Sequence, residues 1–107
     1  MNDLGPKGKE RIGAVISAET RPRLAAKARL RFDARSGQYL LLYPERGLAL
    51  NPTASDILQL CTGAHTVEEI VDQLVAKYVT QPREVVAREV QGFLNSMAER
   101  GLVAEAS

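Results

Sequence analysis

The sequence predicts an α+β domain in which a three-stranded antiparallel sheet is followed by a bundle of three helices. Two observations predict it. Between residues 28 and 50, apolar residues form strand-length segments separated by turn residues. After residue 51, apolar residues recur every three or four positions, the spacing of one face of an α-helix. The chain of 107 residues is 45% hydrophobic and 25% charged, which fits one globular domain.

The first expected strand covers residues 28–32. Leu30 and Phe32 alternate there with Arg29 and Arg31, so one face of the strand is apolar and the other is basic. We therefore expect a half-buried strand with Leu30 and Phe32 facing the core.

The second and third strands follow after short turns. Residues 38–43 are apolar on both faces, which is typical of a central strand. A tight turn at residues 44–47 comes next, and we expect Gly47 to take its positive φ. The third strand covers residues 48–50 and lies at an edge, because the predicted strand order is 1-2-3.

The first helix begins at an N-cap, Asn51 or Thr53, has Pro52 in its first turn, and ends at Gly63. The second helix follows a capping box formed by Thr66 and Glu69. The apolar stripe of the first helix is Ala54, Ile57, Leu58 and Cys61, and that of the second is Val67, Ile70, Val71, Leu74, Val75 and Tyr78.

The third helix starts at Gln81 and Pro82 and is stopped by Gly101. Beyond it, Leu102 and Val103 are expected to fold back as an apolar tail. Its apolar stripe is Val86, Val90, Phe93, Leu94 and Met97.

Residues 1–20 lack regular periodicity and contain the breaker cluster Gly5-Pro6-Lys7-Gly8. We expect them to form a flexible arm ahead of a domain that covers residues 21–107. Residues 1–35 hold nine basic and four acidic residues, whereas the rest hold five and nine. The basic first third indicates either an acidic partner or a solvated arm with strand-edge arginines.

Enzyme chemistry is not favoured, and we expect no catalytic residue, metal or cofactor. Cys61 sits at an apolar helix position and is expected to be a small buried hydrophobe. His65 is expected to be a turn residue, and one cysteine with one histidine is too few for a zinc site. No apolar run is long enough to span a bilayer and no secretory signal is evident, so we expect a cytoplasmic protein.

The order of strands and helices is that of a winged helix-turn-helix, which makes nucleic-acid binding an alternative function. A helix that reads DNA needs basic residues. The second helix instead has a net charge of −2 and the third a net charge of zero. A third possibility is a structural subunit that docks on an enzyme through the basic arm.

Peptide binding is favoured, because the edge strand leaves backbone groups unpaired and an extended peptide can add to them. Gly47 and the small Ala49 leave room for that approach, and the apolar flank of the third helix would form the groove floor. The same stripe can instead be core. The candidate peptide-binding residues are Gly47, Leu48, Ala49, Leu50, Asn51, Val86, Val90 and Phe93.

Several local strings together resemble the PqqD family of pyrroloquinoline quinone biosynthesis. They are Arg21–Leu24, the hairpin Leu41–Gly47, the segment Leu50–Leu58, Leu60–Gly63, Thr66–Val71 and Phe93-Leu94, in which Thr62 replaces the usual Asp. Arm residues 1–20 lie outside the resemblance.

The resemblance implies a non-catalytic peptide chaperone, a recognition element for ribosomally made precursor peptides. Such a protein binds the precursor peptide PqqA and presents it to PqqE, a radical S-adenosylmethionine enzyme. The peptide would add as a strand beside the third strand and pack against the third helix. The oligomeric state stays open between a monomer and an arm-exchanged homodimer.

Overall fold

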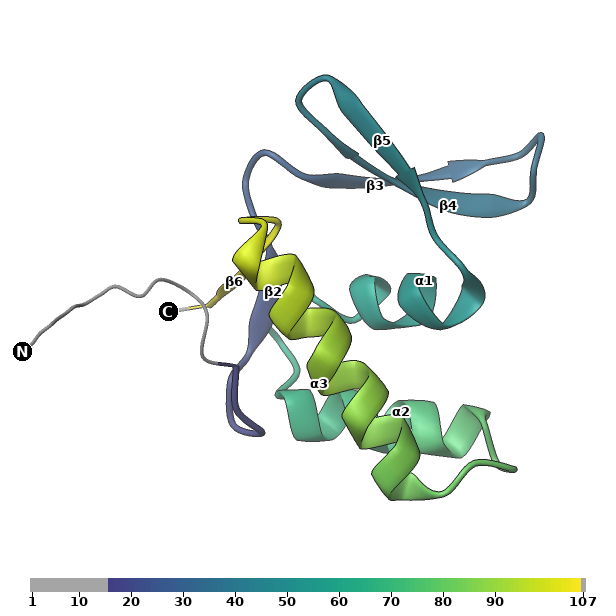
Figure 1. Cartoon of the computed structure of the whole chain (residues 1–107), viewed down its shortest axis with the longest axis vertical. Coiled ribbons are helices and arrows are strands. Elements are labelled where there is room, and N and C mark those ends of the chain that lie inside the picture. Colours follow the sequence, from purple (N-terminus) through teal and green to yellow (C-terminus); the bar gives the residue numbers. More distant parts are fainter. Residues whose placement is uncertain (1–15, 107) are drawn as a thin grey trace, which may run out of the picture.

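The structure, a computed structural model, describes residues 16–106 and contains five strands and three helices within that range. The strands are β2 (Pro22–Leu24), β3 (Arg29–Asp33), β4 (Gln38–Tyr43), β5 (Arg46–Ala49) and β6 (Val103–Glu105). The helices are α1 (Pro52–Gln59), α2 (Val67–Lys77) and α3 (Arg83–Glu99). Strands β3 to β5 occupy one end of the molecule, and α2 with the first half of α3 occupies the other (Figure 1).

The predicted three-stranded sheet is confirmed, with antiparallel order β3-β4-β5 and β4 as the central strand. A second sheet was not predicted: β2 pairs with β6 in antiparallel register. The apolar tail at Leu102 and Val103 does fold back, and Val103 begins strand β6. A strand of three residues is too short to show the alternation by which strands are recognised. The sequence therefore did not indicate that these two distant segments pair.

The hairpin between β4 and β5 corrects two expectations. Tyr43 pairs with Arg46, so the turn has two residues, and Glu45 takes the positive φ of 64° rather than Gly47. Gly47 belongs to β5, which therefore starts and ends earlier than expected.

Phe32 was expected to face the core but is 54% exposed. The ring lies near the end of β3, where it borders an open hollow beside α1 and packs edge-on against Tyr39 with ring centroids 5.3 Å apart. The alternation in β3 was thus correct as a strand signal but not as a measure of burial.

The starts of α1 and α2 and the end of α3 agree with the capping residues in the sequence, whereas α1 ends four residues before Gly63, the expected stop. Asn51 is the N-cap of α1, and Thr66 with Glu69 forms the expected capping box of α2. Helix α1 ends at Gln59, so Cys61 lies beyond the helix rather than on its stripe. Gly101 adopts a φ of 74° directly after the end of α3.

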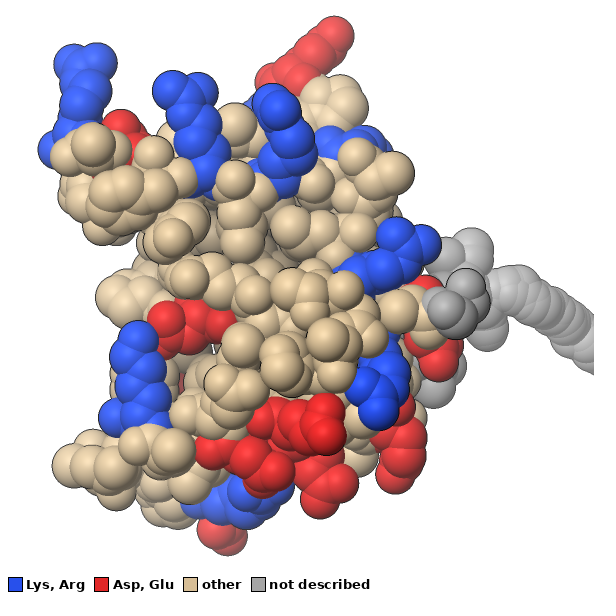
Figure 2. Space-filling view, turned by 180° about the vertical axis from the view of Figure 1, so that it is seen from behind, with Lys and Arg blue, Asp and Glu red and all other residues tan. Residues whose placement is uncertain are grey.

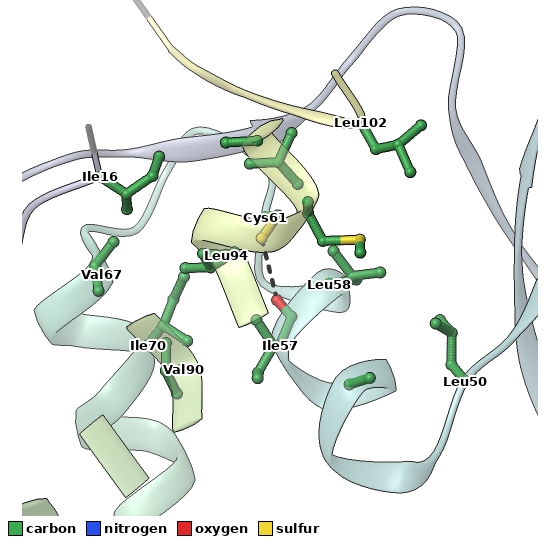
Figure 3. Close-up of a cluster of buried hydrophobic side chains, with 14 of the residues drawn as sticks. Ile16, Leu50, Ile57, Leu58, Cys61, Val67, Ile70, Val90, Leu94 and Leu102 are labelled. Atoms are coloured by element: carbon green, nitrogen blue, oxygen red, sulfur yellow. Dashed lines mark hydrogen bonds between the residues drawn. The ribbon is translucent and has the colours of Figure 1, made fainter. Parts of the chain in front are cut away.

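One core joins all three helices to the central strand β4. Leu41, Ile70, Val90 and Leu94 are fully buried in it, and Ile57, Leu58 and Leu102 are nearly so. Figure 3 shows these helix side chains converging around the segment that carries Cys61. Such burial of Leu and Ile side chains is the main stabilising contribution in a domain of this size.

Residues 16–20 lie against the start of α2. The carbonyl oxygens of Ala18 and Thr20 accept hydrogen bonds from the backbone N–H groups of Glu68 and Val67, respectively. These N–H groups have no partner within the helix, so the segment completes its N-terminus. Residues 1–15 of the expected arm fall outside the described residues.

Cys61 is 3% exposed, and its Sγ donates to the carbonyl oxygen of Ile57 at 3.3 Å (Figure 3). Burial raises the pKa of the thiol to about 12.

We expect Cys61→Ala to lower the free energy of unfolding by about 1 kcal/mol, because it leaves a small cavity. The raised pKa means that the fold favours the neutral thiol. The contribution of the buried thiol to the free energy of unfolding is therefore complete below pH 9 and decreases towards pH 12.

The measurement is urea unfolding of the wild type and Cys61→Ala at several pH values. The difference in stability between them should shrink as the pH rises above 9. A difference that stays constant to pH 11 would show that the thiol is not titrating as a buried group.

Candidate functional site

Strand β5 has a free edge. Within residues 16–106 it pairs with β4 alone, and Gly47 and Ala49 are both exposed. The N–H of Leu50 donates to the carbonyl oxygen of Tyr39 at 3.0 Å, so residue 50 turns its backbone groups toward β4. Backbone groups alternate in direction along an antiparallel strand. Gly47 and Ala49 therefore direct their N–H and C=O groups away from the sheet.

Helix α3 approaches the chain near both ends of this strand. Near the hairpin, Arg100 Nη2 donates to the hydroxyl of Tyr43 at 2.7 Å, and Tyr43 pairs with Arg46. At the other end, Phe93 and Glu89 share a hollow with Asn51. The chain from 46 to 51 and the helix from 89 to 100 both span about 16 Å. The two segments therefore run antiparallel, and we call the surface between them the groove; its length corresponds to about five extended residues.

The hollow at the α1 end of this groove has a volume of about 240 Å³. We call it the α1–α3 hollow, and its lining consists of Asn51, Thr53, Ala54, Ile57, Glu89 and Phe93. The side chain of Asn51 is already engaged, since its Oδ1 accepts from the backbone N–H of Ala54 at 2.8 Å. Phe93 is half-buried with one side packed on the core, so the rest of its ring is available to a ligand.

The candidate residues divide into groove and core. Gly47 and Ala49 are exposed and Leu48 is half-buried, so these three residues of β5 are accessible. Leu50, Val86 and Val90 are buried, at 3%, 3% and 0% exposure, and belong to the core.

The side of α3 that faces the groove therefore differs from the expected side by part of a helical turn. Val86 and Val90 lie in the core instead, because α3 packs against α2. Of the three predicted helix residues, Phe93 alone lines the groove. Glu89, a polar residue that the apolar stripe does not indicate, lies one turn before Phe93 and on the same side.

The charge on the molecule is segregated. Figure 2 shows lysine and arginine side chains mainly at the sheet end and acidic side chains mainly at the opposite end. The exposed basic residues of the sheet are Arg29, Arg31 and Arg46, and the exposed acidic residues of α2 are Glu68, Glu69 and Asp72. Phosphate contacts require basic residues on the helix that enters a DNA groove. The acidic surface of α2 therefore does not support nucleic-acid binding as the function.

The described residues contain no cluster of three His, Cys, Asp or Glu side chains that would hold a metal ion. Among residues 16–106, no helix combines the length and the apolar character needed to cross a bilayer. The hollow and the strand edge offer backbone groups, an aromatic ring and one carboxylate, which suit binding rather than bond-breaking.

A family model described as coenzyme PQQ synthesis protein D (PqqD) matches residues 38–103. A PqqA binding protein of Rhodopseudomonas palustris (strain BisB5) is 42% identical over 92 residues, which cover 86% of this chain and 89% of that protein. A PqqA binding protein of Methylococcus capsulatus (strain Bath) is 34% identical over 84% of this chain and 94% of its own length.

A solved structure shares the fold. It is the solution NMR structure of the PqqD truncation of Methylobacterium extorquens PqqCD, described as a functional, stand-alone recognition element for ribosomally synthesized and post-translationally modified peptides. The TM-score is 0.71 at 28% identity, and the match covers 85% of this chain and 96% of that one.

Proposed function

Because the chain belongs to the PqqD family, we propose that it is a non-catalytic peptide chaperone that binds the precursor peptide PqqA in pyrroloquinoline quinone biosynthesis. The observation that carries this proposal is the free edge of β5 beside the α1–α3 hollow. The relatives named PqqA binding protein support the choice of peptide.

The peptide adds to β5 as an antiparallel or parallel strand. The outward N–H and C=O groups of Gly47 and Ala49 bond its backbone, and the alternation of its side chains directs every second one toward α3. Backbone bonds supply affinity that is independent of sequence, whereas Leu48, Phe93 and the hollow supply selectivity. Ordering the peptide costs conformational entropy, which these contacts must offset.

The chaperone then presents the bound peptide to PqqE, the radical S-adenosylmethionine enzyme of the pathway. Holding the peptide beside the enzyme raises its effective concentration at the active site without any new chemistry from this chain. The basic sheet end is available to an acidic surface of that enzyme while the groove is occupied.

The test is a titration of the ¹⁵N-labelled protein with synthetic PqqA, followed through backbone amide shifts. We expect saturable shifts concentrated on residues 47–51 and on residues 89–99 of α3. The alternative of duplex DNA binding is tested on the same sample and should give no saturable shifts at physiological salt. Absence of peptide shifts both alone and with PqqE present would overturn the proposal.

A further inference from the structure

The α1–α3 hollow combines an apolar floor with a single charge. Ala54, Ile57 and Phe93 supply the apolar surface, and Glu89 is the charged residue among the six that line it. Glu89 is exposed at the rim, so an apolar side chain would fill the floor but leave this carboxylate without a charged partner, whereas a basic side chain would pair with it.

The charge of Glu89 is uncompensated in the described part of the chain. No ion pair between described residues engages it, whereas Asp56 and Asp72 pair with Lys77 and Arg83. One turn before and after it on α3 lie Val85 and Phe93. Arg88 precedes it, but successive side chains on a helix point about 100° apart, so the guanidinium is directed away from the hollow.

On the basis of the proposed function, we propose that Glu89 selects a basic side chain, lysine or arginine, at the position of the bound peptide that enters the α1–α3 hollow. The aliphatic stem lies on Ala54, Ile57 and Phe93, and the charged head reaches Glu89 at the rim. The face of the Phe93 ring is a second favourable surface for a cation. The hollow volume of about 240 Å³ is sufficient for one long side chain.

This assignment also fixes the register of the peptide. The basic residue of the peptide must lie near Asn51, just beyond the C-terminal end of β5. The peptide residues that pair with Ala49 and Gly47 then lie on the hairpin side of it. A peptide that slipped by one residue would direct the basic side chain to the opposite face of the added strand.

The test uses PqqA peptides in which each lysine or arginine is changed in turn to norleucine or to glutamate. Norleucine keeps the aliphatic stem and removes the charge. For the wild type, we expect one position where norleucine weakens binding about three- to fivefold at low salt. Raising the salt to 0.5 M should reduce that difference.

The matching protein variant is Glu89→Lys. It should weaken binding of unmodified PqqA about tenfold, and glutamate at that one peptide position should restore the affinity to within about twofold of the wild-type pair. The control is Glu84→Lys, which changes the net charge equally on the same helix. Glu84 is exposed and lies about 140° round α3 from Glu89. The Glu84→Lys variant should therefore bind each peptide with the same affinity as the wild type.

Two results would overturn the inference. Peptide affinities within twofold of each other in the wild type and Glu89→Lys would show that Glu89 does not select a charge, although the proposed function would stand. Failure of the wild type to bind any PqqA peptide, with or without PqqE, would overturn both.

Discussion

Ala49→Pro is expected to weaken PqqA binding at least tenfold while the domain stays folded. The Ala49 N–H points away from β4, so proline removes a donor from the free edge and no bond from the sheet. A hydrogen bond is worth about 0.5–1.5 kcal/mol net, and the proline ring also obstructs the approach of a second strand. Isothermal titration calorimetry measures the loss, and circular dichroism verifies the fold.

The matched control is Ala49→Val, which adds a larger side chain at the same position but keeps the N–H. Its affinity should stay within about threefold of the wild type, because β-branched residues suit a strand. Leu48→Pro is the complementary variant. Leu48 pairs with Leu41 toward β4, so this proline should destabilise the sheet itself. Equal affinities of Ala49→Pro and Ala49→Val would contradict strand addition at β5.

Modification of the peptide provides a second test that leaves the protein unchanged. Methylation of one peptide N–H at a time should weaken binding at alternate positions, because every second backbone group of the added strand faces β5. A uniform small loss along the peptide would instead indicate that side chains alone hold it.

The parts of the fold that follow a local signal were predictable from the sequence. The capping box at Thr66 and the Gly101 stop depend on neighbouring residues and lie where expected, and Asn51 is the N-cap of α1 out of the two candidates, Asn51 and Thr53. The pairing of β2 with β6 depends on segments about eighty residues apart, and three-residue strands carry no periodic pattern. The register of the hairpin likewise depends on how β4 and β5 pair.

The sequence indicated which elements border the groove, but not which of their side chains face it. The strand order placed β5 at an edge, and a helix stripe next to an edge indicated a groove wall. The part of the stripe that faces the groove depends on the packing angle between α3 and its neighbours, which a periodic pattern does not contain. Val90 therefore lies in the core and Glu89, one residue earlier, lines the hollow.

Two adjacent residues of α3 are expected to separate stability from binding. Leu94 has no exposed surface, and Leu94→Ala should lower the free energy of unfolding by about 2–5 kcal/mol through the lost burial and the cavity. The affinity of the remaining folded molecules for PqqA should be unchanged, because Leu94 does not line the groove. Phe93 is half-buried at the groove wall, so Phe93→Ala should cost less stability and weaken PqqA binding about tenfold or more.

The measurement is a urea titration of each variant and a peptide titration under conditions in which at least nine-tenths of the protein is folded. Phe93→Leu serves as the conservative variant, since it keeps an apolar contact and loses the ring. It should recover most of the stability and only part of the affinity if the ring itself contacts the peptide. A large loss of affinity in Leu94→Ala, with Phe93→Ala close to wild type, would mean that the peptide contacts a different side of α3. The groove between β5 and α3 would then not be the binding site.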